Sequence, residues 1–250
     1  MQSLPALLLL LLTFILTPSA VIAADFSVNP VRIFFLPGKT TDTISIKNLS
    51  DETLTLQLTV FSWDQGGDGE DVYAPTEEII SFPKILKAEK GQERIIRVGS
   101  RVPAGERERT YRIYLEEIYE PGAVPPETTE LKTLLRVGVP VFIMPAKVET
   151  AAEIEGASLE AGELRFTLSN MGNHHFIIRG VFVEGVGAGG EAVFERELAG
   201  RYLHGGRKKA FAVALQENEC VGIRSLRIDI KTDRLSLTRT LDVEAGMCAP

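Results

Sequence analysis

Few residues of this sequence are spaced for covalent chemistry. Serine and aspartate are plentiful, but no motif pairs a nucleophile with a general base. His174 and His175 follow Asn173 and have side chains that ligate metals. Adjacent residues of a strand point to opposite faces, so this run instead predicts a turn. His204 stands alone in the sequence. We therefore predict no enzyme, no metal site and no cofactor.

A glycine-rich run at residues 185–190 formally satisfies the pattern G-x-G-x-x-G after a predicted strand. A dinucleotide site would need a helix to follow it within a βαβ unit. The next segment, residues 191–198, is short and is flanked by β patterns. The run therefore predicts a flexible hairpin loop.

The sequence contains two cysteines, Cys220 and Cys248. In an oxidising compartment an even pair most simply forms one disulfide. Closing a loop of that size would stabilise the fold by about 3–4 kcal/mol. Two buried free thiols are the alternative, and metal ligation would need partners that are not visible nearby.

The first 24 residues predict a secretory signal. Met1 to Ala24 contain no charged side chain, and the segment from Leu7 to Leu16 is almost wholly apolar. An uncleaved membrane anchor is the alternative, but Pro18 breaks a run that is short for a span. Cleavage after Ala23 or Ala24 leaves about 226 residues, enough for two modest domains, and a net charge of −7. An acidic chain of mixed charge is a poor candidate for binding nucleic acid or an anionic membrane.

The remainder consists of short strand patterns separated by turn residues, with no long helical period. The first half predicts strands at residues 26–35 (interrupted at Pro30), 42–48, 54–63, 79–86, 93–98 and 110–119, with loops at 65–71 and 121–130. The second half predicts strands at residues 163–169, 175–184, 191–198, 208–213, 223–231 and 235–243. This spacing predicts an all-β fold of two β-sandwich domains, at residues 25–145 and 146–250.

The stretch from Leu131 to Pro145 is rich in β-branched and aromatic residues and alternates for much of its length, and two prolines mark its end. A period of two places one apolar set on one face: Leu131, Thr133, Leu135, Val137 and Val139. Pro140 cannot donate a ladder hydrogen bond, so the stretch predicts an edge strand. An exposed edge recruits another chain unless its own fold covers it.

Four runs, in this order, resemble the amino-terminal domain of the PapD-like periplasmic pilus chaperones. They are residues 28–34 (VNPVRIF), 82–86 (FPKIL) with 91–98 (GQERIIRV), 106–118 (ERERTYRIYLEEI) and 139–145 (VPVFIMP). Asn48 adds an asparagine that the family places after an early strand. The match spans about residues 26–147, whereas the second domain matches only in size and β character.

The resemblance implies two immunoglobulin-like domains set at an angle, a periplasmic location and a non-enzymatic chaperone. Chaperones of this family bind, stabilise and deliver pilus or fimbrial subunits, whose sandwiches lack a last strand, by lending an edge strand of their own. The implied partners are such a subunit and an outer-membrane usher, with no nucleic acid and no small-molecule substrate. Whether the free chain self-associates to hide its edge is left open.

On this mechanism the apolar set from Leu131 to Val139 fills the subunit's groove. Burying three or four such side chains is worth about 5–9 kcal/mol before association costs. The alternative is that they form ordinary core of their own domain. Lys132 and Arg136 lie on the opposite face, and they would be costly to bury if the faces were reversed.

Arg32 matches the family's arginine that binds the subunit's terminal carboxylate, a task that suits a guanidinium fork. The family's partner lysine falls at Pro140, which carries no charge, so half of this anchor is absent. Lys147 and Arg136 are candidate substitutes on sequence proximity alone.

Arg97 and Glu108 match the positions of a buried ion pair that holds the two domains at their angle. Two unrelated surface charges on neighbouring strands are the alternative.

Two other functions compete with a chaperone. A secreted two-domain structural or adhesive protein would use the same edge to polymerise. A secreted sandwich hydrolase or sugar-binding protein would need a cluster of carboxylates or exposed aromatic residues. Trp63 and the five tyrosines are too scattered in the sequence to support such a cluster.

Overall fold

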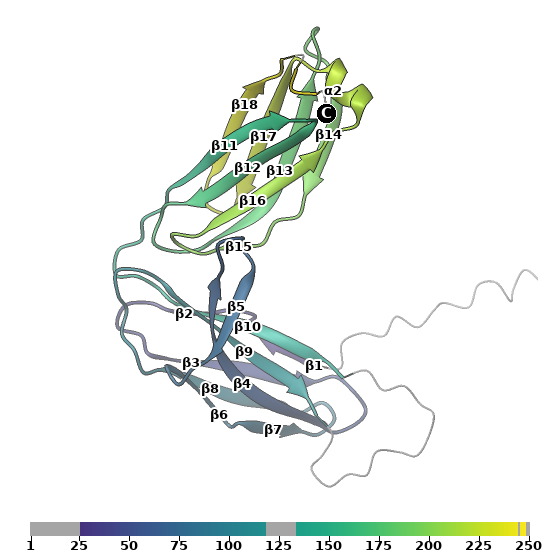
Figure 1. The fold of residues 1–250 in the computed structure, drawn as a ribbon. Coiled ribbons are helices and arrows are strands. Elements are labelled where there is room, and N and C mark those ends of the chain that lie inside the picture. Colours follow the sequence, from purple (N-terminus) through teal and green to yellow (C-terminus); the bar gives the residue numbers. More distant parts are fainter. Residues whose placement is uncertain (1–25, 119–133, 245, 249–250) are drawn as a thin grey trace, which may run out of the picture.

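The computed structural model describes residues 26–118, 134–244 and 246–248. They form two β-sandwich domains that follow one another along a bent, elongated molecule (Figure 1). This confirms the predicted fold class. The predicted signal at residues 1–24 and the loop at 121–130 lie outside the described residues.

The amino-terminal domain packs two sheets face to face. One sheet has the strand order β1-β3-β8-β6, and the other has the order β2-β10-β9-β4-β5, with β7 also paired to β4. The strands are β1 (Phe26–Asn29), β2 (Ile33–Phe35), β3 (Thr41–Asn48), β4 (Leu54–Gln65), β5 (Asp71–Pro75), β6 (Ile79–Phe82), β7 (Ile85–Ala88), β8 (Glu93–Ser100), β9 (Arg109–Glu117) and β10 (Arg136–Ile143).

The carboxy-terminal domain is a second sandwich, with sheets β11-β12-β16 and β14-β13-β17-β18, and with β15 paired to β13. A short helix lies at its far end. The elements are β11 (Ala152–Glu160), β12 (Glu163–Asn170), β13 (Phe176–Val186), β14 (Ala192–Leu198), β15 (Tyr202–Leu203), β16 (Lys208–Ala214), α2 (Glu217–Gly222), β17 (Ser225–Thr232) and β18 (Ser236–Asp242).

Strict alternation along the strands builds the first core. Ile44 and Ile46 of β3, and Ile113 and Leu115 of β9, are fully buried, while the residues between them face away from the core. The chain leaves the first sheet at Pro30 and joins the second as β2, so the first predicted strand serves both sheets. This change of sheet determines which part of β10 is covered.

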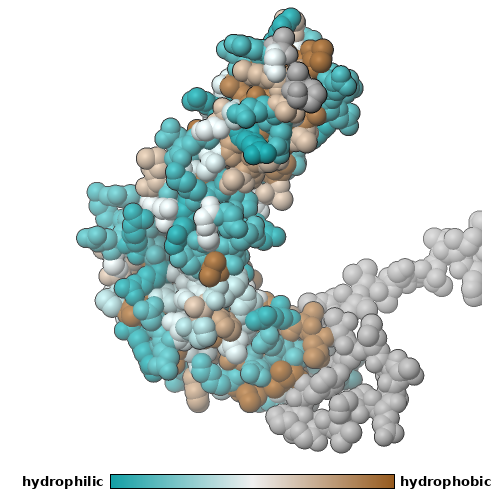
Figure 2. Space-filling view, in the orientation of Figure 1, coloured by the Kyte–Doolittle hydropathy of each residue, from teal (hydrophilic) through white to brown (hydrophobic). Residues whose placement is uncertain are grey.

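Hydrophobic surface is sparse on the face that Figure 2 shows, and some of it gathers at the lower right end of the amino-terminal domain. That is the end at which β10 begins (Figure 1). Among the described residues, no helix is long and apolar enough to cross a membrane.

Candidate strand-addition edge and interdomain junction

The strand β10 has one fully paired flank and one partly paired flank. It pairs antiparallel with β9 along its whole length, from Arg136 to Ile143. On the other flank it pairs in parallel with β2 only from Val141 to Ile143. Among the described strands, none pairs with the second flank from Arg136 to Pro140, and we call this segment the open edge of the sheet.

The backbone groups of this segment alternate between β9 and the open side. Glu117 N–H donates to the Leu135 carbonyl at 2.9 Å, so the odd-numbered residues face β9. Met144 N–H donates to the Phe35 carbonyl at 2.9 Å, so the even-numbered residues face the other flank. Arg136 and Gly138 thus present N–H and C=O groups to the open side, and Pro140, without an N–H, ends the donor row. This explains how a proline fits in a strand that is enclosed farther on.

The predicted apolar set faces the core of its own domain. Val139 is 1% exposed and belongs to that core, while Leu135 and Val137 are only partly buried against it. Leu131 and Thr133 lie outside the described residues. Of the three described members of the predicted apolar set, Val139 therefore belongs to the domain's own core. Leu135 and Val137 remain partly accessible at the open side of the sandwich.

The opposite face of the sheet carries arginines stacked on aromatic rings. The Arg136 guanidinium lies 3.8 Å from the centre of the Tyr114 ring, and its Nε is 2.8 Å from Glu116 Oε1. Phe61 and Tyr73 contact the same Tyr114 ring edge-on, at 5.9 Å each. Arg136 thus already has an aromatic contact and an acidic partner, and it lies four residues before Pro140.

The neighbours of Pro140 are two other arginines. Arg32 lies one residue before the first parallel pair, Ile33 with Val141, and so falls beside Pro140; Arg112 is the β9 residue opposite Pro140. Lys147 is exposed in the linker and pairs with Glu149 at 3.0 Å. Of the sequence candidates, only Arg32 is adjacent to Pro140, and sequence reasoning missed Arg112.

Arg112 is stacked rather than ion-paired. Its guanidinium lies 4.0 Å from the centre of the Trp63 ring and 5.5 Å from that of Tyr73. Within the described part of the chain, no acidic side chain forms an ion pair with it, and its buried Nε has no hydrogen-bond partner. Burial raises the pKa of the Tyr73 phenol, and the Arg112 charge opposes that rise.

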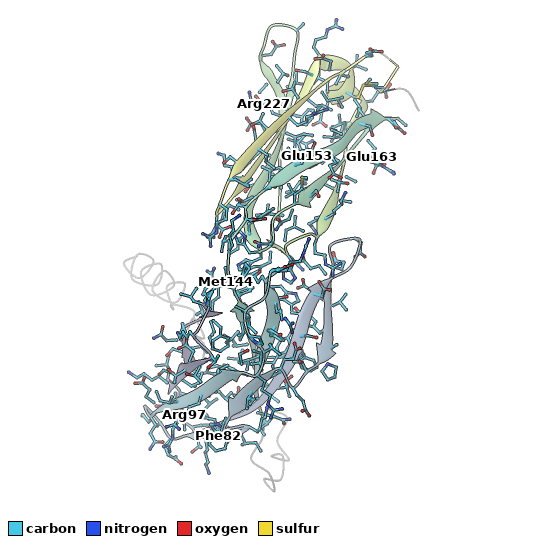
Figure 3. All side chains as sticks on the ribbon, turned by 90° about the vertical axis from the view of Figure 1, so that its left-hand side faces the viewer. Phe82, Arg97, Met144, Glu153, Glu163 and Arg227 are labelled. Carbon is cyan, nitrogen blue, oxygen red and sulfur yellow. A yellow bond between two sulfur atoms is a disulfide. The ribbon has the colours of Figure 1, made fainter. Side chains whose placement is uncertain are left out.

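The predicted pair of Arg97 with Glu108 does not form. Arg97 is exposed on β8. It pairs with Thr43 of β3 on one side and with Phe82 of β6 on the other. Figure 3 places Arg97 and Phe82 at the end of the amino-terminal domain remote from Met144 and the junction. Two matching sequence positions thus lie far apart, because β8 and the segment before β9 belong to different sheets.

Glu108 does join the two domains, with His175 as its partner. The Glu108 carboxylate accepts a hydrogen bond from the His175 backbone N–H at 2.8 Å and lies 2.8 Å from its Nδ1. Both side chains are buried, at 2% and 3% exposure. The His175 ring in turn stacks on Phe142 of β10 at 3.9 Å between centres. The junction and the end of β10 are therefore one packed unit.

All three histidines of the chain meet at this junction. His174, His175 and His204 are each less than 5% exposed, and the His204 ring packs edge-on against Trp63 at 4.4 Å. His204 stands alone in the sequence, but in the fold it packs against Trp63 at the junction. Burial lowers the pKa of His204 to about 4, and burial also lowers the pKa of His174. Among the described residues, no group of three or more histidine, cysteine or acidic side chains is arranged to hold a metal ion.

Polar contacts complete the junction. Asn173 donates from its side chain to the carbonyls of Glu106 and Lys147, both at 2.8 Å. Gln65, at the end of β4, donates to the Tyr202 carbonyl at 2.8 Å and accepts from His204 N–H at 2.9 Å. These hydrogen bonds, together with the buried pair of Glu108 and His175, hold the angle between the domains.

At the far end of the second domain, Cys220 and Cys248 form a disulfide. It ties α2 to the carboxy-terminal segment of the chain. It lies away from β10 and contributes no group to the open edge.

The family model for the amino-terminal domain of PapD, described as a chaperone of pili and flagellar assembly, matches residues 25–149. Sequence comparison with curated proteins finds no match.

Solved structures of chaperones match over nearly their whole length. One is the CsuC–CsuE chaperone–tip adhesion subunit pre-assembly complex from the archaic chaperone-usher Csu pili of Acinetobacter baumannii, at TM-score 0.59 and 16% identity, covering 87% of this chain and 98% of that chain. A second is the class 5 fimbriae chaperone CfaA, at TM-score 0.57 and 13% identity, covering 86% of this chain and 98% of that chain. A third is the Salmonella enterica SafA pilin with the SafB chaperone, at TM-score 0.56 and 14% identity, covering 89% of this chain and 99% of that chain. At these identities the likeness shows a shared fold.

Proposed function

The chain belongs to the PapD family of pilus-assembly chaperones, and we propose that it binds a pilus or fimbrial subunit by adding the open edge of β10 to that subunit's incomplete sandwich. Backbone pairing along an edge gives affinity, and alternate side chains that enter the partner give specificity. The chaperone would then hold the subunit until an outer-membrane usher receives it. No covalent chemistry is part of this proposal.

The observation that carries the proposal is the one-sided pairing of β10 from Arg136 to Pro140. Natural sheets usually cover or blunt an edge of this kind. Here two residues, Arg136 and Gly138, present backbone donors and acceptors toward the open side. A subunit that lacks a strand supplies the complementary backbone groups.

The apolar contribution comes from the inner face of the same segment. Leu135 and Val137 are partly buried at the open side of the sandwich, so a partner's groove would complete their burial. Because part of their surface is already buried, each contributes less than the roughly 1.5–3 kcal/mol of a fully exposed side chain. Leu131 and Thr133 would extend the contact upstream, as the sequence predicts.

Arg32 is the proposed anchor for the subunit's terminal carboxylate. It lies beside Pro140, where the open edge ends, and no described acidic side chain forms an ion pair with it. A strand that pairs with the open edge must end there, because β2 occupies the flank beyond. The end of the added strand would therefore meet the Arg32 guanidinium, which suits an anion.

The periplasm is the proposed location. The predicted signal at residues 1–24 supports export, and the disulfide between Cys220 and Cys248 suits an oxidising compartment.

The test is a proline placed where it blocks only the open side. The Arg136 N–H faces away from β9, so Arg136→Pro removes an outward donor and leaves the bonds to β9 intact. The matched control is Arg136→Ala, which keeps the backbone donor. Each variant is co-expressed with its cognate pilus subunit, and the soluble complex is measured.

We expect Arg136→Pro to lower the yield of complex at least tenfold, and Arg136→Ala to leave it within about twofold, since one hydrogen bond and the approach of a strand are lost only in the first. Circular dichroism of the purified variants shows whether both remain folded. Normal accumulation of complex with Arg136→Pro would contradict strand addition at this edge.

A further inference from the structure

We infer that the junction between the two domains is an acid-operated hinge: protons taken up by His174 and His204 loosen it while each β-sandwich stays folded. This hinge does not require strand addition at β10, and it is tested without a subunit.

The histidines of the chain are confined to the junction. The sequence contains three, and His174, His175 and His204 are each less than 5% exposed. Histidine is the one side chain whose ordinary pKa lies between about pH 5 and about pH 8. Each of the two hydrophobic cores consists of side chains that do not titrate in mild acid. A fall in pH from about 7 to about 5 therefore acts on the junction before it acts on either sandwich.

The hydrogen bonds of His204 determine which of its ring nitrogens carries the proton. The Thr110 hydroxyl donates its one hydrogen to the Trp63 carbonyl, so its oxygen can only accept from His204 Nδ1, which lies at 3.5 Å. Nδ1 therefore carries the proton of the neutral ring. Nε2 is left with a lone pair, and this atom is buried without a hydrogen-bond partner in the described part of the chain.

His174 has the same arrangement. Its Nδ1 lies 3.1 Å from the Glu149 carbonyl, which can only accept, so Nδ1 carries the proton. Its Nε2 is also buried, and no described group forms a hydrogen bond with it. In both rings a second proton would enter at Nε2, where the closed junction offers no acceptor. Because a buried charged donor without an acceptor is costly, protonation favours a junction that has opened to water.

The charged groups around the two rings are already engaged. Those that face His204 are His175, Asp64, Asp71 and Arg207, and those that face His174 are Glu108, Arg234 and His175. Asp64 pairs with Arg207, and Glu108 pairs with His175. Asp71 accepts hydrogen bonds from two neighbours of its own. None of these carboxylates forms a hydrogen bond with Nε2 of either ring, as the described contacts show.

The pKa values follow from this environment. Burial lowers the pKa of both histidines, and that of His204 falls to about 4. The closed junction therefore binds protons less readily than an open one, in which the pKa returns towards about 6.5. The closed state is fully favoured above about pH 6.5, and this advantage is lost as the pH falls towards about 4. For His204 alone, the ratio of open to closed junction should rise about twentyfold between about pH 7 and about pH 5.

The contacts that would separate include the ring of Trp63. This ring of the first domain packs on Tyr202 and His204 of the second, at 5.2 and 4.4 Å between ring centres. It is the one tryptophan of the sequence, and it is 2% exposed in the closed junction. Its fluorescence therefore reports on the junction alone.

The experiment follows the full-length exported chain from about pH 7 to about pH 5 and back, the range in which histidine titrates. Three quantities are recorded: the emission maximum of Trp63, the radius of gyration by small-angle X-ray scattering, and the far-ultraviolet circular dichroism. The test variant carries His174→Asn and His204→Asn together, because the asparagine amide can donate in place of Nδ1 but cannot take up a proton. The matched control is Glu184→Gln, which removes a carboxylate that pairs with Arg227 outside the junction.

We expect the unmodified chain and Glu184→Gln to show a reversible shift of Trp63 emission to longer wavelength and a larger radius of gyration in acid. The circular dichroism should stay constant, because both sandwiches remain folded. The double variant should show neither change. In proton NMR of the unmodified chain, the ring signals of His174 and His204 should titrate in the same pH range as the emission, which tests the hinge even if the double variant does not fold.

Four results would overturn the inference. They are constant emission and scattering in the unmodified chain, an undiminished response in a folded double variant, loss of circular dichroism together with the emission shift, and histidine titration that does not coincide with it. Each of them leaves strand addition at β10 untouched.

Discussion

The two halves of β10 share one strand but have different surroundings. From Val141 to Ile143 the strand lies between β9 and β2, and these residues are at most 2% exposed. From Arg136 to Pro140, β9 is its one neighbour among the described strands. The first half of the strand thus keeps an unpaired flank, whereas the second half is enclosed by two strands and packs against the domain junction. Changes in the enclosed half should affect folding, and changes in the open half should affect binding.

The largest expected effect comes from the enclosed half. Phe142 is fully buried, and its ring stacks on His175 and lies 6.2 Å from Trp63. Phe142→Ala should lower the free energy of unfolding by about 3–5 kcal/mol, because it leaves a cavity where two domains meet. Urea denaturation measures this. A loss below about 1 kcal/mol would mean that the junction does not hold this half of the strand.

The next largest effect should appear in the open half, and in binding. Replacing both Leu135 and Val137 by Asp introduces charge where a partner's apolar groove would close over them. We expect an approximately hundredfold loss of affinity for the subunit, about 3 kcal/mol, and degradation or aggregation of the subunit in co-expression.

The loss of folding stability in this double variant should be smaller than in Phe142→Ala, because both side chains are partly exposed. Normal accumulation of the subunit with this variant would show that Leu135 and Val137 do not bind the subunit's apolar groove.

Lowering the pH should reduce the free energy of unfolding through His204, which packs on Trp63 beside the enclosed half of β10. Its pKa is lowered to about 4, chiefly by burial, with His175, Asp64, Asp71 and Arg207 as the charged neighbours. Because the folded state binds the proton less readily than the unfolded state, stability falls as the pH drops below about 6.5 and continues to fall until about 4.

Between pH 7 and pH 5 this histidine should remove about 2 kcal/mol of stability. His204→Asn should flatten the dependence, whatever its effect at pH 7. Denaturation midpoints measured across this range provide the check, and an unchanged pH slope in the variant would assign the acid sensitivity to other groups.

The smallest effect should come from the exposed charge of the open half. Arg136 is 52% exposed and pairs with Glu116 on the neighbouring strand. Arg136→Ala should change the free energy of unfolding by less than about 1 kcal/mol, as exposed pairs usually do. A larger loss, measured by the same denaturation, would mean that its contact with Tyr114 supports the strand.

Much of this fold could be predicted from strand periodicity. The alternation in β3 and β9 and the break at Pro30 predicted the strands that build the first core. The sequence prediction missed β11, because the register shifts between Glu155 and Ser158, around Gly156 with a φ of +60°, and breaks the period. It also missed β5, which is short and largely exposed. The glycine-rich run did form the hairpin between β13 and β14, with Gly190 N–H donating to the Gly187 carbonyl at 3.1 Å.

Less of the candidate site than of the fold could be predicted from the sequence. Motif positions correctly drew attention to Glu108 but paired it with Arg97, because a motif does not report which sheet a residue joins. The meeting of His204 with Trp63 joins residues 141 positions apart, and no local pattern encodes it. Arg112 is one of three arginines within residues 107–117, and only the register opposite Pro140 distinguishes it.

Amide hydrogen exchange on β10 tests the account most directly. In the free chain, the amides of Val137 and Val139 face β9 and should be protected, whereas those of Arg136 and Gly138 face the open side and should exchange rapidly. On binding the subunit, Arg136 and Gly138 should become as protected as their neighbours. If their exchange is already slow in the free chain, or remains fast in a stable complex, β10 is not the strand that the chaperone adds.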